Sequence, residues 1–363
     1  MHVGLIIGSE RIGGYENQMR LLARGLLAAG YKVTIIFTDH PHCRLQRNPS
    51  ARLDFSGIPN IKLCIRRGYK YFYYPFGTML MRLKKIDLLI ACDPANAYAG
   101  SILASSQCKL ITRISGLIFT LPGYEWEKAL LTSAVAMSDA VISNAQVALD
   151  TVRDLGLLPP DKYQCVIRNA VNIADCSVNT VAGRFHVLYV GRLQPVKDPV
   201  TLLKALETAK QHLPELTAEF VGDGALFGEM KQYIEKQNLS GFIKLTGFCP
   251  QEKIPYEQAD LVVNSSISEL SSGAIAEALC RGIPVVATDV GGNPELLAGY
   301  EFGALVPPQD PDAMAQKIVY FARKTPEERR ILGQQAQAYA RQNFSLENYV
   351  KNYIRLISHV AAR

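Results

Sequence analysis

The sequence has no long apolar run and no signal for export. Its longest apolar stretches, such as residues 87–91 (DLLIA) and 283–287 (IPVVA), are as long as a strand, whereas a membrane-spanning helix needs about 18 apolar residues. No charged leader precedes the apolar run at residues 3–7, so we expect no signal peptide. The eight cysteines form no C-x-x-C pair and have no histidine at metal-ligand spacing, so neither a disulfide scaffold nor a zinc site is predicted. We expect a cytoplasmic protein with reduced thiols.

The charge is unevenly distributed along a chain of otherwise ordinary composition. With 363 residues, of which 48% are hydrophobic and 20% charged, the chain is expected to fold as two domains. The formal net charge is +6, yet residues 1–173 carry 20 Lys and Arg against 12 Asp and Glu, whereas residues 174–363 carry 19 against 21. The basic excess therefore belongs to the first half and hints at an anionic partner such as a phosphate or a membrane.

Part of this excess lies in residues 65–83, where the stretch IRRGYKYFYYPFG interleaves basic and aromatic side chains. The pattern is typical of a membrane interface or of a site for the phosphate of a lipid carrier, and it fits equally a strand end whose aromatic rings fill the core. A nucleic-acid partner is not expected, because stacking aromatics would lie across a sheet face or an OB-like fold that the sequence does not show. The first interpretation predicts a cytoplasmic protein peripheral to the inner face of an anionic membrane.

Short β-branched runs alternate with segments of helical period, which predicts parallel sheets built from βαβ units. The expected strands are residues 3–7, 33–37, 61–65, 88–91, 110–113, 140–143, 164–167, 187–190, 218–221, 243–245, 261–264 and 285–287. The polar, aperiodic residues 171–184 divide them into two sets and are interpreted as a linker. We expect an α/β fold of two Rossmann-like, doubly wound domains, 1–173 and 182–344, that face each other across a cleft, with a C-terminal helix over 345–363 able to pack back on the first.

The densest group of small and polar residues follows the strand that ends at Asn264. A Ser-rich loop carries Glu269, and a helix is expected to begin near Ser271 or Ser272 without bulky residues, so that its free amides and positive dipole end can meet a phosphate. Glu277 lies about one turn inside that helix, where its carboxylate can accept two ribose hydroxyls. Each acid alone would be read as a helix cap or a solvated residue, but the pair beside a bare helix start favours a nucleotide-sugar pocket.

A pair of cations follows the first strand of the second domain. Gly191 permits a tight turn, and Arg192 and Lys197 leave the strand end with a proline between them. Two cations aimed at a cleft can hold a diphosphate and stabilise it as it departs, whereas either residue alone would be an ordinary basic surface residue.

Three glycine turns complete the candidate site. Gly13 and Gly14 lie between the first strand and the first helix, where they allow backbone amides to approach a phosphate or a sugar closely. The turns that contain Gly222 and the pair Gly247 and Phe248 each follow a strand and are placed to bound a base pocket. A Gly-Gly turn is weak evidence by itself, and the chain lacks the G-x-G-x-x-G and P-loop patterns.

These groups, in this order, resemble the retaining glycosyltransferases of family 4, which have the GT-B fold. The resemblance covers nearly the whole chain and rests on the Gly-Gly turn, G-x-x-V-T (30–34), I-x-N-x-V (167–171), G-R-L-x-x-x-K (191–197), G-D-G (222–224), L-x-G-F (245–248), E-x7-E (269–277) and G-x-P-V-V-A-T-x-x-G-G-x-x-E (282–295). It implies that the second domain holds most of a donor nucleoside diphosphate sugar and that the first domain holds the acceptor.

The resemblance also implies a role for each matching residue. Arg192 and Lys197 would grip the diphosphate, Glu277 would bind ribose hydroxyls, and Glu269 would contact hydroxyls of the donor sugar. The remaining donor contacts would be the backbone amides of Ser272, Gly273 and Ala274 at the phosphate and sugar, Ile275, Gly247 and Phe248 at the base, and Gly14 over the phosphate.

The chain departs from the family on the acceptor side. Where the family usually has a His before a Gly, this chain has Ser115 before Gly116, and residues 91–93 (ACD) replace an H-x-H-like element. Arg113 and Asn169 complete the expected acceptor side. These differences bear on acceptor activation and turnover rather than on donor binding.

We therefore expect a retaining hexosyltransferase that moves a hexose from a UDP-sugar, with UDP-glucose as the default donor, to a glycan or polyprenyl-linked acceptor in polysaccharide biosynthesis. Its catalytic group would be Glu269, Arg192 and Lys197. No metal or other cofactor is expected, because the cations and the helix start meet the charge of the leaving diphosphate. Two alternatives stay open: a non-catalytic nucleotide-sugar-binding module, which the missing His motivates, and a nucleotide-sugar 2-epimerase of the same fold.

Overall fold

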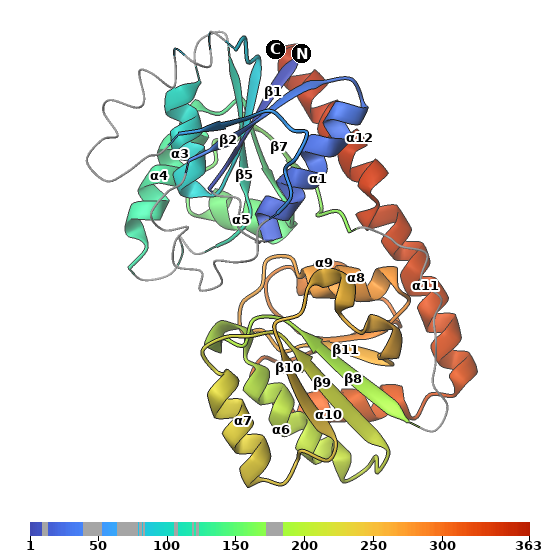
Figure 1. The fold of residues 1–363 in the computed structure, drawn as a ribbon. Coiled ribbons are helices and arrows are strands. Elements are labelled where there is room, and N and C mark those ends of the chain that lie inside the picture. The colour runs from blue at the N-terminus through green and yellow to red at the C-terminus, as the bar shows by residue number, and fades with distance from the viewer. Residues whose placement is uncertain are drawn as a thin grey trace. The chain divides into compact units, whose positions relative to one another are not determined.

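The computed structural model separates the chain into two α/β units (Figure 1). One unit contains Met1–Ala170 and Leu346–Arg363, and the other contains Val171–Ser345. The residues described are 1–8, 14–38, 53–63, 79, 82, 84–104, 108–117, 120, 123–171 and 184–363. Residues 172–183 of the expected linker at 171–184 and most of the aromatic and basic segment at 65–83 lie outside the described residues.

The described residues of the first unit form a seven-stranded parallel sheet in the order β3-β2-β1-β4-β5-β6-β7. Its strands are β1 (His2–Ile7), β2 (Lys32–Phe37), β3 (Asn60–Lys62), β4 (Leu88–Cys92), β5 (Lys109–Ile114), β6 (Ala140–Ser143) and β7 (Tyr163–Val166). Its helices are α1 (Gly14–Ala28), α3 (Pro94–Leu103), α4 (Glu125–Met137), α5 (Gln146–Asp154) and α12 (Leu346–Ala361). Because side chains alternate along a strand, Leu5 and Ile7 join the core with α1 and α12, while Ile6 joins the core with α3 and α4.

The C-terminal helix α12 completes the core of the first unit. Its Tyr349 and Tyr353 are buried with side chains of β1 and β4, and the Tyr349 hydroxyl donates to the Gln18 carbonyl oxygen of α1 at 3.3 Å. The two helices approach so closely that a Cβ on Gly25 would lie 2.2 Å from a methyl carbon of Val350. The last helix of the chain thus packs against the first one.

The second unit forms a six-stranded parallel sheet in the order β10-β9-β8-β11-β12-β13. Its strands are β8 (Phe185–Val190), β9 (Leu216–Val221), β10 (Ile243–Gly247), β11 (Leu261–Asn264), β12 (Val285–Thr288) and β13 (Gly303–Val306). Its helices are α6 (Pro199–Lys210), α7 (Phe227–Lys236), α8 (Gly273–Cys280), α9 (Asn293–Leu297), α10 (Pro311–Ala322) and α11 (Pro326–Phe344). Three 3-10 turns, η3 (Pro195–Lys197), η4 (Gln251–Lys253) and η5 (Tyr256–Gln258), lie between them.

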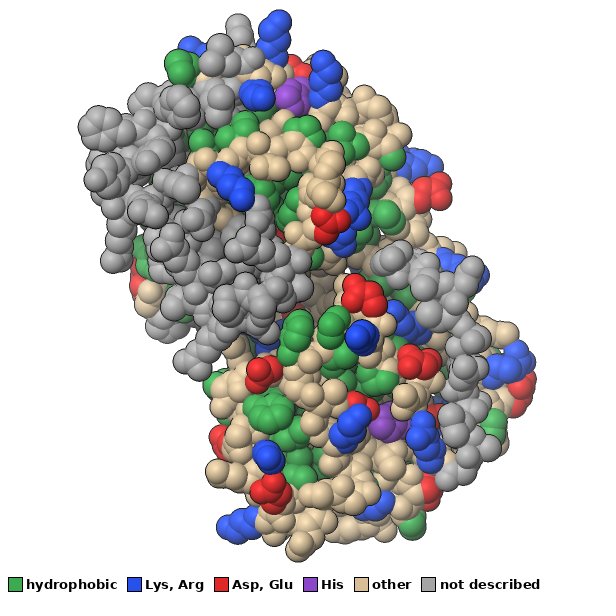
Figure 2. All heavy atoms as spheres, in the orientation of Figure 1, with side chains coloured by type: hydrophobic (Ala, Val, Ile, Leu, Met, Phe, Trp, Pro, Cys, Tyr) green, Lys and Arg blue, Asp and Glu red, His purple; other side chains and the backbone are tan. Residues whose placement is uncertain are grey.

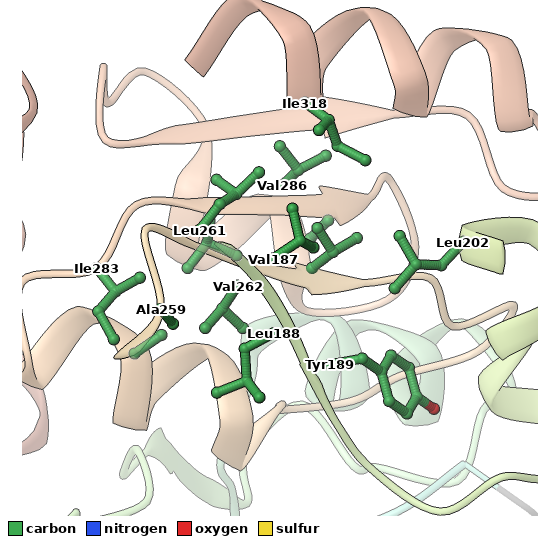
Figure 3. Close-up of a cluster of buried hydrophobic side chains, with 14 of the residues drawn as sticks. Val187, Leu188, Tyr189, Leu202, Ala259, Leu261, Val262, Ile283, Val286 and Ile318 are labelled. Carbon is green, nitrogen blue, oxygen red and sulfur yellow. The ribbon is translucent and has the colours of Figure 1, made fainter. Parts of the chain in front are cut away.

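Neighbouring strands of the second unit fill its core from both faces of the sheet (Figure 3). Val187, Leu261 and Val286 extend toward the side of Ile318 on α10, whereas Leu188 extends toward the opposite side. Strands buried on both faces read as short continuous apolar runs, which is the pattern that marked them in the sequence. Basic and acidic side chains are interspersed over the visible surface of this unit, in keeping with its nearly balanced charge (Figure 2).

The expected α/β class with two parallel, doubly wound sheets is confirmed. One described strand was missed, β13, because Gly303–Val306 is a short edge strand that is half-buried over most of its length. The expected strand at 61–65 is β3, which ends at Lys62, and residues 64 and 65 lie outside the described residues. Among the described residues, no helix combines the length and the hydrophobicity needed to traverse a bilayer.

Candidate functional site

The site in the second unit is built on two loops that follow adjacent parallel strands. One loop leaves β8 after Val190 and the other leaves β11 after Asn264, and the two strands are hydrogen-bonded neighbours. Strand order reverses between β8 and β11, since β9 and β10 continue to one side and β12 and β13 to the other. In open α/β sheets, ligands bind outside the carboxyl ends of the strands at such a switch point. The topology therefore places both loops where a ligand is expected.

Backbone and side-chain bonds tie these two loops together. The Ile267 amide donates to the Val196 carbonyl oxygen at 2.9 Å, and the Ser265 hydroxyl donates to the Lys197 carbonyl oxygen at 3.1 Å. At their ends, the Lys197 ammonium group forms an ion pair with the Glu269 carboxylate. Two residues that are 72 positions apart in sequence are thus brought into direct contact.

Arg192 and Lys197 differ in their surroundings. The Lys197 and Glu269 side chains are 20% and 12% exposed, so the ion pair is largely withdrawn from solvent. The Arg192 side chain is exposed and has no hydrogen bond or ion pair with a described residue, while its carbonyl oxygen accepts from the Tyr189 hydroxyl at 3.2 Å. Burial and the nearby Glu269 carboxylate raise the pKa of Tyr189, so this phenol stays a neutral donor. Arg192 therefore offers a free guanidinium at the same loop.

The start of α8 presents free backbone amides beside Glu269. Ser272 caps the helix by accepting from the Ile275 amide at 3.4 Å, and the Asn264 side-chain amide donates to the same hydroxyl at 3.1 Å. The amides of Gly273 and Ala274, in the first turn, have no partner among the described residues. The helix begins at Gly273, directly after the start near Ser271 or Ser272 that the sequence predicted, and its first turn can receive an anion.

Ile275 lies in the first turn of α8. Its side chain is fully buried in the core of the second unit. In this structure only the backbone of Ile275 is available to a base, because the apolar side chain packs in the core, and its role at the base stays a prediction. Its amide, held by Ser272, contributes to the helix cap instead.

Glu277 lies on α8 in a polar and aromatic surrounding. Its carboxylate accepts from the Gln251 side-chain amide at 2.9 Å, and its carbonyl oxygen accepts from Arg281 at 3.0 Å. The Arg281 guanidinium lies 4.4 Å from the ring centre of the buried Tyr256. Burial raises the pKa of Glu277, an effect that the Tyr256 hydroxyl, the Arg281 charge and the hydrogen bond from Gln251 oppose. The Gln251 contact also links α8 to the turn that carries the half-exposed Phe248.

The glycines at the strand ends serve close backbone packing. A Cβ on Gly222 would lie 1.8 Å from the Gly191 carbonyl oxygen, and one on Gly224 would lie 2.2 Å from the Leu193 carbonyl oxygen. The Gly222 amide donates to the Gly247 carbonyl oxygen at 2.8 Å. Gly191, Gly222 and Gly247 thus hold the Arg192 loop against the neighbouring strand ends, which brings these predicted residues to one edge of the sheet.

Gly291 and Gly292, to which the sequence assigned no role, fix the backbone of Glu269. The Gly292 amide donates to the Glu269 carbonyl oxygen at 3.1 Å, and Gly291, at a φ of +52°, lies directly against the same atom. A Cβ on Gly291 would be 1.6 Å from the Glu269 carbonyl oxygen. The G-G pair of the 282–295 motif was the available signal, but only the fold shows that it contacts Glu269.

The first unit has a polar group at the carboxyl ends of β4 and β5. The Ser115 hydroxyl donates to the Asp93 carboxylate, and Asp93 has a left-handed backbone with a φ of +67°. Glu16, in the first turn of α1, is buried, and Gly14 begins that helix. Gly13 lies outside the described residues. Like β8 in the second unit, β1 here borders the switch point of its sheet, next to β4.

Arg113 is buried, whereas its partner Asn169 is half-buried. The Arg113 side chain is 1% exposed and donates to the Asn169 side-chain oxygen. Burial lowers the pKa of Arg113, but the nearby Tyr353 and Tyr349 of α12 and Cys92 outweigh this effect, so its pKa lies above its ordinary value. The Arg113 side chain is not exposed to an acceptor in this structure, because both faces of β5 are covered, and its acceptor role stays a prediction.

Glu16 makes the stability of the first unit depend on pH. Burial raises the pKa of its carboxyl group to about 7, and the Asp93 charge adds to the effect. The folded protein therefore retains a proton that the unfolded chain releases, so stability falls as the pH rises from about 4.5 toward 7. We expect Glu16→Gln to stabilise the protein by about 2–3 kcal/mol at pH 8 and to have little effect at pH 4.5.

Thermal melts of the parent and Glu16→Gln proteins across this pH range would measure the effect. The exposed Glu235→Gln on α7 is the matched control and should shift the melting temperature equally little at every pH. A stabilisation by Glu16→Gln that is the same at pH 4.5 and pH 8 would contradict the assignment, since it would not arise from titration.

Among the described residues, no three His, Cys, Asp or Glu side chains are grouped so that they could hold a metal ion. The candidate site in the second unit thus consists of an ion pair, a free guanidinium, two free amides and the carboxylate of Glu277. Such a set can bind a polyanion beside hydroxyl groups.

Comparison with known proteins identifies relatives of both units. A family model described as glycosyl transferases group 1 matches residues 177–339, and one described as Glycosyltransferase Family 4 matches residues 12–175. The putative glycosyltransferase EpsD of Bacillus subtilis is 31% identical over 43% of this chain and 41% of its own length. The GPI3 subunit of phosphatidylinositol N-acetylglucosaminyltransferase of Saccharomyces cerevisiae is 27% identical over 79% of this chain and 67% of its own length.

The structural comparison extends over the whole chain. The Anabaena protein Alr3699/HepE, crystallised with UDP, superposes with a TM-score of 0.81 at 22% identity and covers 99% of this chain and 100% of its own. The two-domain GT-B fold is therefore confirmed. In sequence, however, the chain spans about half the length of several curated relatives that it matches, with 41%, 47% and 48% covered in three of them.

Proposed function

Because the chain belongs to the group 1, family 4-like glycosyl transferases, we propose that it transfers a hexose from a nucleoside diphosphate sugar to a glycan or lipid-linked acceptor in polysaccharide biosynthesis. The proposal rests on one observation above all, the meeting of Lys197, Glu269 and the α8 start at the ends of the adjacent strands β8 and β11. Cations and free amides suit a diphosphate, and a carboxylate beside them suits sugar hydroxyls.

We infer that the donor is a UDP-sugar, with UDP-glucose as the first candidate. HepE, which shares the fold, was crystallised with UDP and with UDP-glucose, and this supports a uridine donor. Glu277 would accept the ribose hydroxyls, for which the Gln251 contact holds its carboxylate at the rim of α8. The half-exposed Phe248 on the Gly247 turn would contact the base.

In the proposed reaction the diphosphate leaves as the bond to the anomeric carbon breaks. Arg192, Lys197 and the amides of Gly273 and Ala274 would stabilise the charge that develops on it, without a metal ion. The acceptor hydroxyl would enter from the same face of the oxocarbenium-like sugar and give its proton to the departing phosphate oxygen, so that the configuration is retained. Glu269 would orient the sugar through its hydroxyls rather than attack it.

The acceptor would be held by the first unit. Ser115, hydrogen-bonded to Asp93, would receive the acceptor hydroxyl at the carboxyl ends of β4 and β5. The basic excess of residues 1–173 supports an acceptor with an anionic lipid carrier, or a membrane that bears one, on the cytoplasmic side. Asn169 would be held in place by Arg113, which donates to its side-chain oxygen.

A donor screen with UDP release as the readout tests this function. We expect the parent protein to release UDP from UDP-glucose or a related donor in the presence of a glycan acceptor, and Glu277→Gln to raise KM about 10-fold or more, because it loses charge-assisted bonds to ribose. Glu235→Gln is the control for loss of one carboxylate in the same unit.

The same screen separates the alternatives. A thermal shift with UDP but no turnover with any donor and acceptor would identify a binding module. A change of donor sugar without acceptor, followed by proton NMR, would identify an epimerase. Either result would overturn transfer as the function of this chain.

A further inference from the structure

The ion pair of Lys197 and Glu269 joins two side chains that the proposed function assigns to different parts of the donor. Lys197 would hold the diphosphate, and Glu269 would hold the sugar. Without a ligand they hold each other, and both are largely withdrawn from solvent. A diphosphate that binds the lysine therefore competes with the carboxylate for its charge. Arg192 has no such competitor among the described residues.

The backbone around the pair is fixed independently of the pair itself. The Lys197 carbonyl oxygen accepts from the Ser265 hydroxyl, and the Ile267 amide donates to the Val196 carbonyl oxygen. The Glu269 carbonyl oxygen accepts from the Gly292 amide. Exchange of partners therefore requires only that the two side chains move, while both loops keep their bonds.

Resting on the proposed function, we propose that this ion pair is a product-release device: Glu269 competes with the diphosphate for Lys197 whenever no sugar is bound to Glu269. When a UDP-sugar enters, the ammonium group turns to the diphosphate, and the freed carboxylate accepts hydrogen bonds from the sugar hydroxyls. After transfer the sugar is gone and the carboxylate has no donor. The carboxylate then forms the ion pair with the ammonium group again, which lowers the affinity for UDP.

The pairing of charges explains why the site would bind the UDP-sugar in preference to UDP. In the donor complex each of the two charged side chains has a ligand partner, whereas in the UDP complex a carboxylate is left without a partner beside a polyanion. An unpaired, partly buried carboxylate is unfavourable, and its proximity to the diphosphate adds repulsion. UDP is therefore bound less tightly than its own contacts with Arg192, Lys197 and the α8 amides would allow.

The test is the affinity for UDP of Glu269→Gln, measured by titration calorimetry. Glutamine keeps the size of the side chain but cannot neutralise the ammonium group. We expect UDP to bind roughly fivefold more tightly than to the parent, because a partly exposed ion pair no longer has to be given up. The preference for UDP-glucose over UDP should shrink, and UDP should become a stronger product inhibitor of any remaining transfer.

Two further proteins make the result specific. Glu327→Gln removes one carboxylate from the exposed Arg330 pair on α11 and should leave UDP affinity unchanged. In a Lys197→Ala background, Glu269→Gln should give less than about half of its effect on the binding free energy, since no lysine remains to be released. An unchanged gain in that background would overturn the inference.

Binding of UDP to the parent protein separates a failure of the proposed function from a failure of the inference about the ion pair. If the parent does not bind UDP or any other nucleoside diphosphate, the proposed function fails and the device fails with it. If the parent binds UDP but Glu269→Gln binds it equally or more weakly, the device is wrong and the proposed function stands, with Glu269 then serving to position Lys197.

Discussion

Replacement of Lys197 by alanine should lower kcat/KM for sugar transfer by about 100-fold to 1000-fold, the loss expected when one preorganised donor to a developing charge is removed. Without a ligand the ammonium group is paired with Glu269, and the backbone of its loop is bonded to Ser265 and Ile267, bonds that stay in place when the ammonium group turns to the diphosphate. Its positive charge is therefore in place before the diphosphate begins to leave. Steady-state kinetics with the preferred donor would measure the loss.

Because the backbone bonds of the loop are kept, we expect Lys197→Ala to lower activity without preventing folding. Ser265 donates to the carbonyl oxygen of residue 197, which alanine retains, so the melting temperature should fall little. The exposed Lys231→Ala on α7 is the matched control for loss of one positive charge in the same unit, and it should keep the parent kinetics. Equal kinetics for Lys197→Ala and Lys231→Ala would remove Lys197 from the proposed chemistry.

The sheets could be predicted because each parallel strand carries its own signal. Strands such as β6 (Ala140–Ser143) and β11 (Leu261–Asn264) are buried on both faces, so a short apolar run between polar segments is enough to locate them. The edge strand β13 has no such run, because three of its four residues are only half-buried. Its pairing with β12 depends on tertiary structure that a local pattern does not contain.

The candidate site could be predicted in part for a similar reason. The chain order of β8 and β11 and the switch-point rule place Arg192, Lys197 and Glu269 at one edge, and the structure brings Lys197 and Glu269 together there. The sequence pattern did not predict whether a side chain near the site extends toward the ligand or into a core. Ile275 lies in the first turn of α8 and Arg113 lies in β5, yet both side chains are buried, Ile275 in the core of the second unit and Arg113 beside α12.

The contact between Gly291 and Glu269 could not be predicted from the sequence pattern either. It leads to a prediction of a large effect on both transfer and stability. Gly291→Ala should lower transfer about 100-fold and destabilise the second unit by about 1–3 kcal/mol. The new methyl group would lie 1.6 Å from the Glu269 carbonyl oxygen, which neither backbone can tolerate without a shift. A displacement of about 1 Å at Glu269 would carry its carboxylate away from both Lys197 and the sugar.

A second glycine separates this displacement from simple backbone strain. Gly299 also has a positive φ, +82°, but a Cβ there meets no atom within 4 Å. Gly299→Ala should therefore show a comparable cost of the left-handed backbone in thermal melts and keep the parent kcat/KM. If both variants lost stability and neither lost activity, Gly291 would be a turn residue only. Loss of activity in Gly291→Ala alone would show that the geometry of Glu269 depends on the absence of a side chain at Gly291.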